Sequence, residues 1–385
     1  MQISKDIKYI GVNDHINSLF EGQYSIPKGM SYNSYLIEDE KTAVMDTVDG
    51  GFTTQWLENL EAALSGRKPD YLVVHHMEPD HSANIAVFME RYPEAVIVSS
   101  QKAFGMMKNF FGTDYADRRV VVGENDTLSL GKHTLTFITA PMVHWPEVIM
   151  SYDSLDKVLF SADAFGKFGA LDSNDEEWEN EARRYYFGIV GKFGMPVSGV
   201  LKKAAKLDIA VICPLHGPVL SENISHYLEL YTKWAAYEPE TDGVLIAYTS
   251  VYGNTRKAAL MLEEKLSAKG CPVISMDLAR CDRAEALAMA FKYKKLVCAS
   301  TTYNGGVFPF MRDFITDLAD HGYKSRQVYL IENGSWAPMA ANAMKKLFEG
   351  CKDVVISENI IKINSAVNAE NIAQTGALAE EIAAL

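Results

Sequence analysis

Apolar and polar positions follow one pattern before residue 240 and another after it. In the first part, short apolar runs follow one another with few long helical segments between several of them. Runs of this length and composition predict strands in mixed or antiparallel sheets with covering helices. The predicted strands are SYLI (34–37), TAVMD (42–46), YLVVH (71–75), AVIVSS (95–100), HTLTFITA (133–140), VIMSY (148–152), KVLFS (157–161) and IAVICP (209–214).

In the second part, strands alternate strictly with helical segments, which predicts a doubly wound parallel sheet and an α/β fold class. The strands are expected at 243–250, 272–278, 294–300, 327–333 and 353–363. The helices are expected at 254–270, 283–293, 312–320 and 337–350, followed by a final helix to Leu385. The polar, turn-forming segment 238–242 separates the two patterns, so we predict domains at 1–241 and 242–385.

The composition supports two globular domains and argues against some classes of binding partner. A chain of 385 residues is too long to fold around one ordinary hydrophobic core, and 48% of its residues are hydrophobic. No apolar stretch approaches the roughly 20 residues that span a bilayer, and the charged N-terminal segment lacks the apolar run of a secretory signal. We therefore expect a cytoplasmic protein without a membrane span. The net charge of -13 opposes binding to nucleic acid, and the five cysteines form no C-x-x-C pair.

The segment 71–81 is the most informative part of the chain. A buried strand runs into His75, His76, Glu78, Asp80 and His81, and such a density of polar groups is costly unless they bind something. Two residues apart in an extended segment, His76 and Glu78 project to the same side. The proline at position 79 favours that extended form, and the residues after the bend can reach a second metal ion.

Three further candidates each follow an apolar strand and precede a turn: His144, Asp163 and His216. A single histidine or aspartate at a strand end more often caps a turn, but the dense first cluster raises the weight of all three. Together the seven side chains suffice for a dinuclear centre, because a carboxylate can bridge two metal ions. The remaining histidines lack such a context and are interpreted as structural; they include His15, His133, His226 and His321.

Three loops in the second part fall at strand ends, where doubly wound sheets bind ligands. They carry hydroxyl groups, amides, glycines and the aromatic faces of Tyr303 and Trp336, which suit a phosphate and a flat ring. A bare turn would explain one loop, but three at one edge predict a binding site. Neither a G-x-G-x-x-G motif nor a ribose-binding acid is present, so NAD is disfavoured. The predicted contacts are Ser250, Val251, Tyr252, Gly253, Asn254, Thr255, Thr302, Tyr303, Asn304, Gly305, Asn333, Gly334, Ser335 and Trp336.

The first part resembles the metallo-β-lactamase-like superfamily, with its His-x-His-x-Asp-His motif followed by single His, Asp and His ligands, and the second part resembles flavodoxin. Glu78 stands where most members of the superfamily have a second histidine, which moves the metal preference from zinc toward iron or manganese. With APMVHWPE and LFSADAFG, this departure makes the whole chain similar to the flavodiiron proteins. The resemblance implies an αββα domain followed by a flavodoxin-like domain.

The resemblance also implies the cofactors, two non-haem iron ions and FMN. One iron would be bound by His76, Glu78 and His144, the other by Asp80, His81 and His216, with Asp163 as the bridge. The family histidine that corresponds to His76 can turn away and leave a water in its place. His75 is then a candidate for supporting contacts, and Trp145, Tyr185 and Tyr186 are candidates for the pocket wall or for ordinary packing.

The implied activity is reduction of dioxygen to water, of nitric oxide to nitrous oxide, or of both. Electrons would come from a separate donor, rubredoxin-like or a reduced deazaflavin, and pass through FMN to the irons. The expected assembly is a head-to-tail homodimer or a dimer of dimers. Two alternatives remain at this stage: a zinc-dependent hydrolase with a regulatory flavodoxin-like module, and a non-catalytic electron carrier or scaffold, which would leave the seven candidate ligands unexplained.

Overall fold

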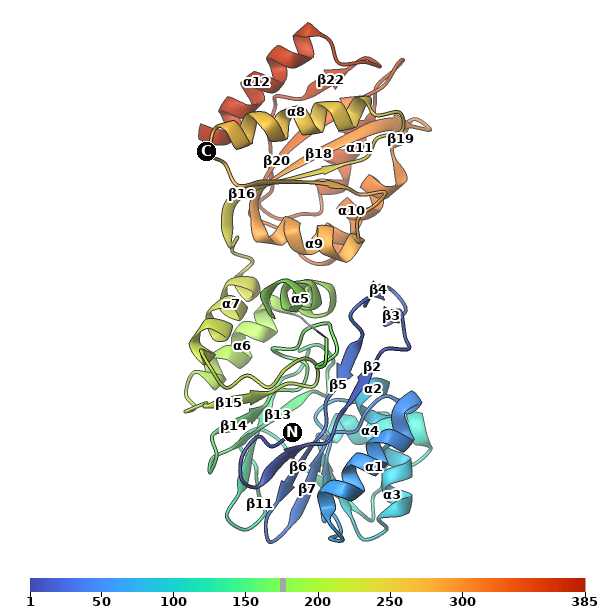
Figure 1. The fold of residues 1–385 in the computed structure, drawn as a ribbon, viewed down its shortest axis with the longest axis vertical. Helices are drawn as coiled ribbons and strands as arrows, with labels where there is room; N and C mark the ends of the chain where they lie inside the picture. Colours follow the sequence, from blue (N-terminus) through green and yellow to red (C-terminus); the bar gives the residue numbers. More distant parts are fainter. Residues whose placement is uncertain (174–177, 385) are drawn as a thin grey trace. The chain divides into compact units, whose positions relative to one another are not determined.

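The computed structural model describes residues 1–173 and 178–384. The chain divides into two compact units, Met1–Ala235 and Ala236–Leu385 (Figure 1). The predicted boundary between residues 241 and 242 lies a short way after this division. It falls next to Thr241, where the first strand of the second unit, β16, begins. No helix that the structure describes is both long and apolar enough to cross a membrane.

Two mixed sheets build the first unit. The six-stranded sheet has the order β1 (Ile7–Tyr9), β6 (Tyr35–Glu38), β7 (Thr42–Met45), β8 (Tyr71–Val73), β9 (Val96–Ser99) and β10 (Arg119–Val121). The five-stranded sheet has the order β11 (Thr127–Ser129), β12 (Thr134–Thr139), β13 (Ile149–Asp153), β14 (Val158–Phe160) and β15 (Val211–Cys213). Antiparallel and parallel pairs occur in both, which confirms the mixed sheets predicted from the short apolar runs.

The core of the first unit lies between the two sheets. Successive strand residues face opposite sides, so one side of each sheet can be apolar and turned inward. Val73 and Val98 of the first sheet and Phe137 and Phe160 of the second belong to one buried cluster. Burying such a side chain contributes about 1.5–3 kcal/mol. Helices cover the outer faces, which makes the αββα sandwich (Figure 1).

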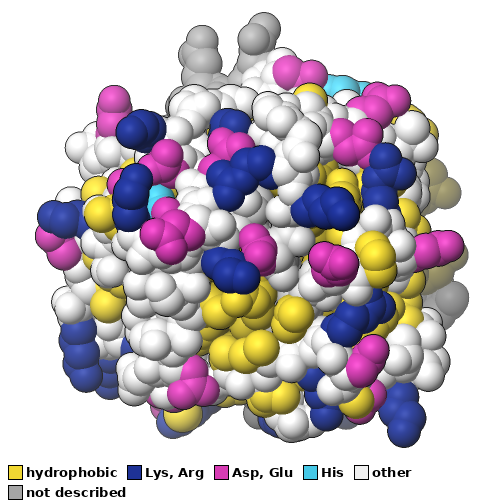
Figure 2. Space-filling model, turned by 90° about the horizontal axis from the view of Figure 1, so that it is seen from below, with side chains coloured by type: hydrophobic (Ala, Val, Ile, Leu, Met, Phe, Trp, Pro, Cys, Tyr) yellow, Lys and Arg dark blue, Asp and Glu magenta, His cyan; other side chains and the backbone are white. Residues whose placement is uncertain are grey.

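The helices of the first unit are α1 (Thr53–Leu64), α2 (Pro79–Ser82), α3 (Ile85–Arg91), α4 (Gln101–Phe111), α5 (Trp178–Tyr185), α6 (Gly194–Ala204) and α7 (Ile224–Ala236). Two small sheets pair β2 (Val12–Asp14) with β5 (Met30–Tyr32) and β3 (Leu19–Phe20) with β4 (Tyr24–Ser25). Among the described residues, charges of both signs are interspersed over the face drawn in Figure 2. That face therefore offers no one-signed surface for a polyanion.

The second unit is built on one parallel sheet of order β17 (Val273–Asp277), β16 (Thr241–Tyr248), β18 (Tyr293–Tyr303), β20 (Gln327–Asn333) and β21 (Val355–Ile356). In chain order this is the 2-1-3-4-5 arrangement of flavodoxin-like folds. The predicted single strand at 353–363 is wrong, because β21 is separated from β22 (Ile361–Ile363). Val328 and Ile331 of β20 pair with Ile356 and Ile361, so the segment between the two short strands holds extra residues and leaves the sheet.

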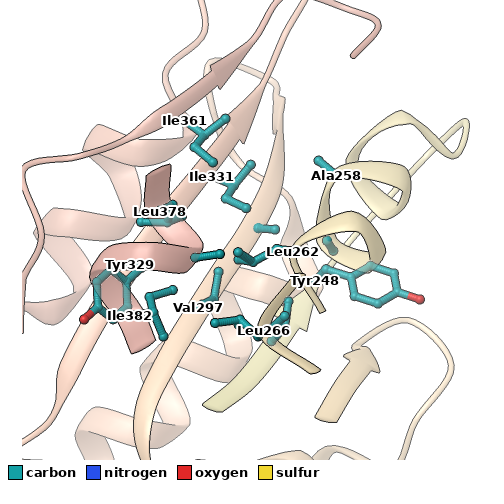
Figure 3. Packing of buried hydrophobic residues seen from close by; sticks show 14 of the residues in the cluster. Tyr248, Ala258, Leu262, Leu266, Val297, Tyr329, Ile331, Ile361, Leu378 and Ile382 are labelled. Carbon is teal, nitrogen blue, oxygen red and sulfur yellow. The ribbon is translucent and has the colours of Figure 1, made fainter. Parts of the chain in front are cut away.

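Helices cover both faces of this sheet. On one face lie α8 (Asn254–Ala268) and α12 (Ala369–Ala384); the others are α9 (Arg283–Lys292), α10 (Pro309–Asp320) and α11 (Ala340–Phe348). In Figure 3, Leu262 and Leu266 of α8 and Leu378 and Ile382 of α12 pack with Val297 of β18. Each helical pair is spaced by four residues, the spacing that places side chains on one helix face.

Candidate metal centre and cofactor pocket

The strand β8 delivers the first ligand candidates to one edge of the sandwich. The strand ends at Val73, and Glu78, at the end of the following loop, has a φ of -59° and a ψ of 139°, the extended conformation of a residue that precedes proline. Pro79 then occupies the first turn of the short helix α2, a position that proline favours. The helix turns Asp80 and His81 toward the same region as Glu78, as the sequence predicts.

The seven candidate ligands come together in two groups. In the first, His144 Nε2 lies 3.0 Å from Glu78 Oε2 and 3.3 Å from His76 Nε2. In the second, His81 Nε2 lies 3.0 Å from His216 Nε2 and 3.3 Å from Asp80 Oδ2. In each group the potential ligand atoms lie within 4.8 Å of one another. Each group therefore has the dimensions of a site for one metal ion.

Asp163 lies between the groups and faces both. Its Oδ2 atom is 3.1 Å from His144 Nε2 and 3.4 Å from His76 Nε2. Its Oδ1 atom is 3.2 Å from His81 Nε2 and 3.7 Å from His216 Nε2. One oxygen per group is the arrangement that a bridging carboxylate requires.

The chemistry of this cluster fits a pair of cations. The carboxylates of Asp80 and Asp163 are buried, yet among the described residues neither receives a hydrogen bond of good geometry. Imidazole nitrogens also face each other in pairs, an arrangement that is unfavourable unless a proton or a metal ion lies between or beside them. Histidine nitrogens mixed with several carboxylate oxygens suit iron, manganese or zinc.

The ionisable groups of the cluster shift one another's pKa values. Burial disfavours the charged form of His144, but Asp163 and Glu78 outweigh it and raise the pKa of His144 to about 9. Burial likewise opposes ionisation of Asp163, but the surrounding histidines hold its pKa well below the usual value. The carboxylates are thus ready to bind a cation, whereas His144 must first lose a proton.

Contacts behind the ligands orient them. His76 Nδ1 lies 2.8 Å from Glu147 Oε1, and His216 Nδ1 lies 2.8 Å from the carbonyl oxygen of Ser31. Such contacts fix which imidazole nitrogen faces the metal. Glu147 was not among the residues predicted from the sequence.

The neighbouring His75 belongs to a separate buried network. Its Nδ1 atom is 2.5 Å from Asp46 Oδ2 and its Nε2 atom is 2.8 Å from Ser151 Oγ. Both ring nitrogens are therefore engaged away from the ligand groups. These contacts hold the loop at the end of β8 and involve no candidate ligand, so they match ordinary packing of His75 rather than support of the metal ligands.

Aromatic rings wall the metal cluster. The ring centre of Trp145 lies 5.2 Å from that of His76, and the ring centre of Tyr185 lies 5.6 Å from that of His216. Tyr186 packs instead against Tyr231 and the aromatic core beside it. Two of the three aromatic candidates thus border the site, and the third is ordinary packing.

The other histidines have ordinary partners. His15 pairs with Asp172 and His226 with Glu179 at the surface, and His321 contacts the carbonyl oxygen of Asp317. His133 is buried and lies 3.1 Å from Asp153 Oδ2, which also accepts from the Asp156 amide. His133, Asp153 and Asp156 thus lie close together in a turn held by hydrogen bonds, which agrees with the structural role expected for His133.

The second unit holds a cavity of about 590 Å³ at the carboxyl edge of its sheet, a size typical of cofactor sites. All three predicted loops line it. Of the predicted contacts only Gly253 is not part of the wall; the wall includes Ser250, Val251, Tyr252, Asn254, Thr255, Thr302, Tyr303, Asn304, Gly305, Asn333, Gly334, Ser335 and Trp336. Gly253 instead adopts a φ of 90° and leads into α8, a conformation that suits glycine.

Hydroxyl and amide groups converge at the start of α8. Thr255 Oγ1 lies 3.1 Å from Thr301 Oγ1, and Asn333 Nδ2 donates to Thr255 Oγ1 at 3.4 Å. Free backbone N–H groups and the positive end of the helix dipole make such a helix start suitable for a phosphate. Tyr252 and Trp336, at 93% and 84% exposure, leave their faces open at the rim of the cavity.

The loop at residues 300–306, the second of the three along the chain, differs from the sequence prediction. It was expected as an open loop after a strand ending at Ser300, but β18 continues to Tyr303 and forms a hairpin with β19 (Gly306–Val307). Asn304 and Gly305 have φ angles of 50° and 73°, as in the tight turn that Asn-Gly favours. Thr302 also accepts hydrogen bonds from the amides of residues 339 and 340, so it caps α11 as well as lining the cavity.

Four residues beyond the predicted contacts also line the cavity: Thr301, which lies in one of the predicted loops, and Ala337, Met339 and Ser365. Ser365 follows β22 and donates to Ser335 Oγ at 2.8 Å. Its position after the last strand of the sheet was the available signal, because every strand of a parallel sheet ends at this edge.

A sandwich of two mixed sheets with paired histidine and carboxylate groups at one edge defines a metallo-β-lactamase-like domain, and the second unit defines a flavodoxin-like one. The family model described as "ODP family beta lactamase" matches residues 30–217. The anaerobic nitric oxide reductase flavorubredoxin of Vibrio vulnificus is 30% identical over 348 residues, which cover 87% of this chain and 70% of the relative.

Two solved structures are similar over the whole chain. The rubredoxin oxygen:oxidoreductase of Desulfovibrio gigas has a TM-score of 0.92 and 26% identity, covering 100% of this chain and 98% of that one. The flavodiiron protein of Giardia intestinalis has a TM-score of 0.93 and 25% identity, covering 100% and 95%. The chain belongs to the flavodiiron protein family, and the family and fold predicted from the sequence are confirmed.

Proposed function

We propose that the protein is an oxidoreductase that reduces dioxygen to water, nitric oxide to nitrous oxide, or both, at a pair of iron ions served by FMN. The observation that carries the proposal is Asp163, which directs one carboxylate oxygen to each of two ligand groups. The names of the related flavorubredoxin and oxygen:oxidoreductase support a reductase of small gases.

The ligand assignment follows from the two groups. His76, Glu78 and His144 would bind one iron, and Asp80, His81 and His216 the other, with Asp163 shared. Glu78 adds a hard oxygen ligand, which supports iron over zinc. Trp145 and Tyr185 pack on ligands and limit the access of water to the pair.

The cavity of the second unit is proposed to bind FMN. The hydroxyl groups of Thr255 and Thr301 and the start of α8 would receive the phosphate. The aromatic faces of Tyr303 and Trp336 would lie along the ring. Together the cofactors supply the electrons: two ferrous ions and a two-electron reduced flavin hold the four that reduction of dioxygen to water requires.

The donor, the assembly and the location complete the proposal. A separate donor, rubredoxin-like or a reduced deazaflavin, would reduce the flavin in the cytoplasm. The assembly would be a head-to-tail homodimer, alone or in a dimer of dimers, in which the flavin of one chain serves the irons of the other. The exposed side chains of Val251, Tyr252 and Trp336 around the cavity support a protein contact at this rim.

Metal analysis and an anaerobic gas assay test the proposal together. Protein produced with iron and zinc both available should contain about two irons and one FMN per chain. After full reduction it should consume dioxygen, nitric oxide or both. Recovery of two zinc ions with hydrolytic turnover would instead support the hydrolase, which Glu78 and the flavodoxin-like unit disfavour.

A further inference from the structure

Glu147 forms a buried contact with His76 that the ligand assignment does not use. The Glu147 side chain comes from the loop between β12 and β13 and is 2% exposed. Its Oε1 atom lies 2.8 Å from His76 Nδ1 and accepts a hydrogen bond from the backbone amide of Met77 at 2.9 Å. One carboxylate oxygen thus holds both the ring of His76 and the backbone that follows it.

This contact determines which nitrogen of His76 faces the metal group. A carboxylate oxygen is an acceptor, so the proton of the imidazole lies on Nδ1 when His76 is neutral. Nε2 is left with its lone pair and faces Glu78 Oε2 at 3.2 Å, His144 Nε2 at 3.3 Å and Asp163 Oδ2 at 3.4 Å. Rotation of the ring out of the group would break the contact with Glu147 and disturb the edge contact with Trp145.

The position of Glu147 is itself fixed. Ser100 Oγ donates to the carbonyl oxygen of Glu147 at 2.8 Å, which ties the loop to the start of α4. The second carboxylate oxygen, Oε2, has no hydrogen-bond partner among the described residues. Among the described residues, the side-chain contacts of Glu147 are thus directed to His76 and the residue after it, as orientation of a ligand requires.

We propose that Glu147 is a positioning residue that holds the ring of His76 with Nε2 directed into the metal group. The inference rests on the proposed metal centre and adds to it a residue that acts through a ligand. Glu147 and His144 lie on the same loop, so one loop supplies a ligand and orients another of the same group.

Metal affinity of four variants tests the role of Glu147. Metal-free wild type, Glu147→Leu, Glu147→Gln and His76→Ala would be titrated with Fe²⁺ under anaerobic conditions against a competing chelator. Loss of an outer contact to a ligating histidine typically costs about 10-fold to 100-fold in metal affinity. We expect that loss for one of the two ions in Glu147→Leu, and a smaller loss in Glu147→Gln, whose carbonyl oxygen still accepts from Nδ1.

The double variant His76→Ala with Glu147→Leu separates positioning from general stability. If Glu147 acts through His76, the double variant binds iron no more weakly than His76→Ala alone. Glu124→Leu is the matched control, because Glu124 is a loop glutamate that contacts Thr139 and Lys203 and no ligand. Its iron affinity should equal that of the wild type. Thermal unfolding of each metal-free variant reports whether it is folded.

Two results would overturn the inference: wild-type affinity for both ions in Glu147→Leu, or losses that add in the double variant. The absorption spectrum of Co²⁺-loaded protein gives a second readout, since Glu147→Leu and His76→Ala should change it alike; unlike spectra would also contradict the proposal. No gas turnover enters the comparison. A wild type that binds two irons but reduces neither gas would contradict the proposed activity and leave the role of Glu147 standing.

Discussion

The carboxylate of Asp163 lies 3.2 Å from His81 Nε2 through Oδ1, while its other oxygen faces the opposite pair of histidines. A single side chain thus contacts both ligand groups. Its removal should affect both metal ions, whereas loss of a terminal ligand should affect chiefly one.

Asp163→Asn tests the bridge. The amide keeps the shape of the side chain but removes the negative charge and one of the two anionic oxygens. We expect the variant to retain less than about half of the wild-type iron and to lose at least 100-fold in gas reduction, in line with metal-ligand contacts generally. Asp117→Asn, at an exposed carboxylate, is the control. Wild-type iron content in Asp163→Asn would contradict the bridge.

Replacing both Asn254 and Thr255 with glutamate tests the phosphate site. Two negative charges at the start of α8 repel a phosphate where the helix dipole and the hydroxyl groups would otherwise attract it. We expect at least a 100-fold rise in the dissociation constant of FMN, measured by flavin fluorescence. Ser267→Glu, at the far end of the same helix, should leave it unchanged. Full occupancy in the double variant would show that the phosphate lies elsewhere.

Subunit mixing tests whether electrons cross between chains. One inactive variant carries His81→Ala with Asp163→Ala and binds no iron; the other carries the two glutamates at 254 and 255 and binds no FMN. If the flavin of one chain serves the irons of its partner, a heterodimer has one complete pair of cofactors. Activity should then return to part of the wild-type value once mass spectrometry shows exchange. Confirmed exchange without activity would mean that electrons move within one chain.

The pH dependence of the metal-free protein follows from His144, whose pKa is raised from 6.5 to about 9. A raised pKa in the folded state stabilises the protein below the ordinary value, and that stabilisation is lost as pH rises through the folded value. The melting temperature of metal-free protein should therefore fall between pH 6.5 and about 9. His144→Ala should reduce this fall in melting temperature, whereas the control His226→Ala, at an exposed histidine, should not. An equal fall in the wild type and both variants would mean that groups other than His144 cause it.

The sequence was most informative where periodicity and chemistry coincide. The strands next to Asp163 and His216 could be predicted because they are apolar runs followed by turns, and the parallel pair β14–β15 brings their ends together. The seven candidate ligands could be named because each polar group follows a buried strand. Parallel strands place such residues at one edge without any knowledge of side-chain contacts.

Other features depend on contacts that a single sequence does not display. In the sequence alone, Glu147 is an ordinary loop glutamate. Its contact with His76 is seen only when β8 and the β12–β13 loop are placed together. The extent of the break between β21 and β22 is set by the register against β20. The polar residues Ser357, Glu358 and Asn359 indicate an interruption, but the sequence does not show how many residues leave the sheet.

The short segment from His76 to His81 carries ligands for both metal groups, two on either side of Pro79. An ion bound by one half of the segment would restrict the backbone of the other half before a second ion arrives. Binding of the first ion would thus already carry part of the conformational entropy cost of ordering the second pair of ligands. Loading of the two metals should therefore be cooperative, so that partly filled protein separates into empty and doubly occupied molecules with few singly occupied ones.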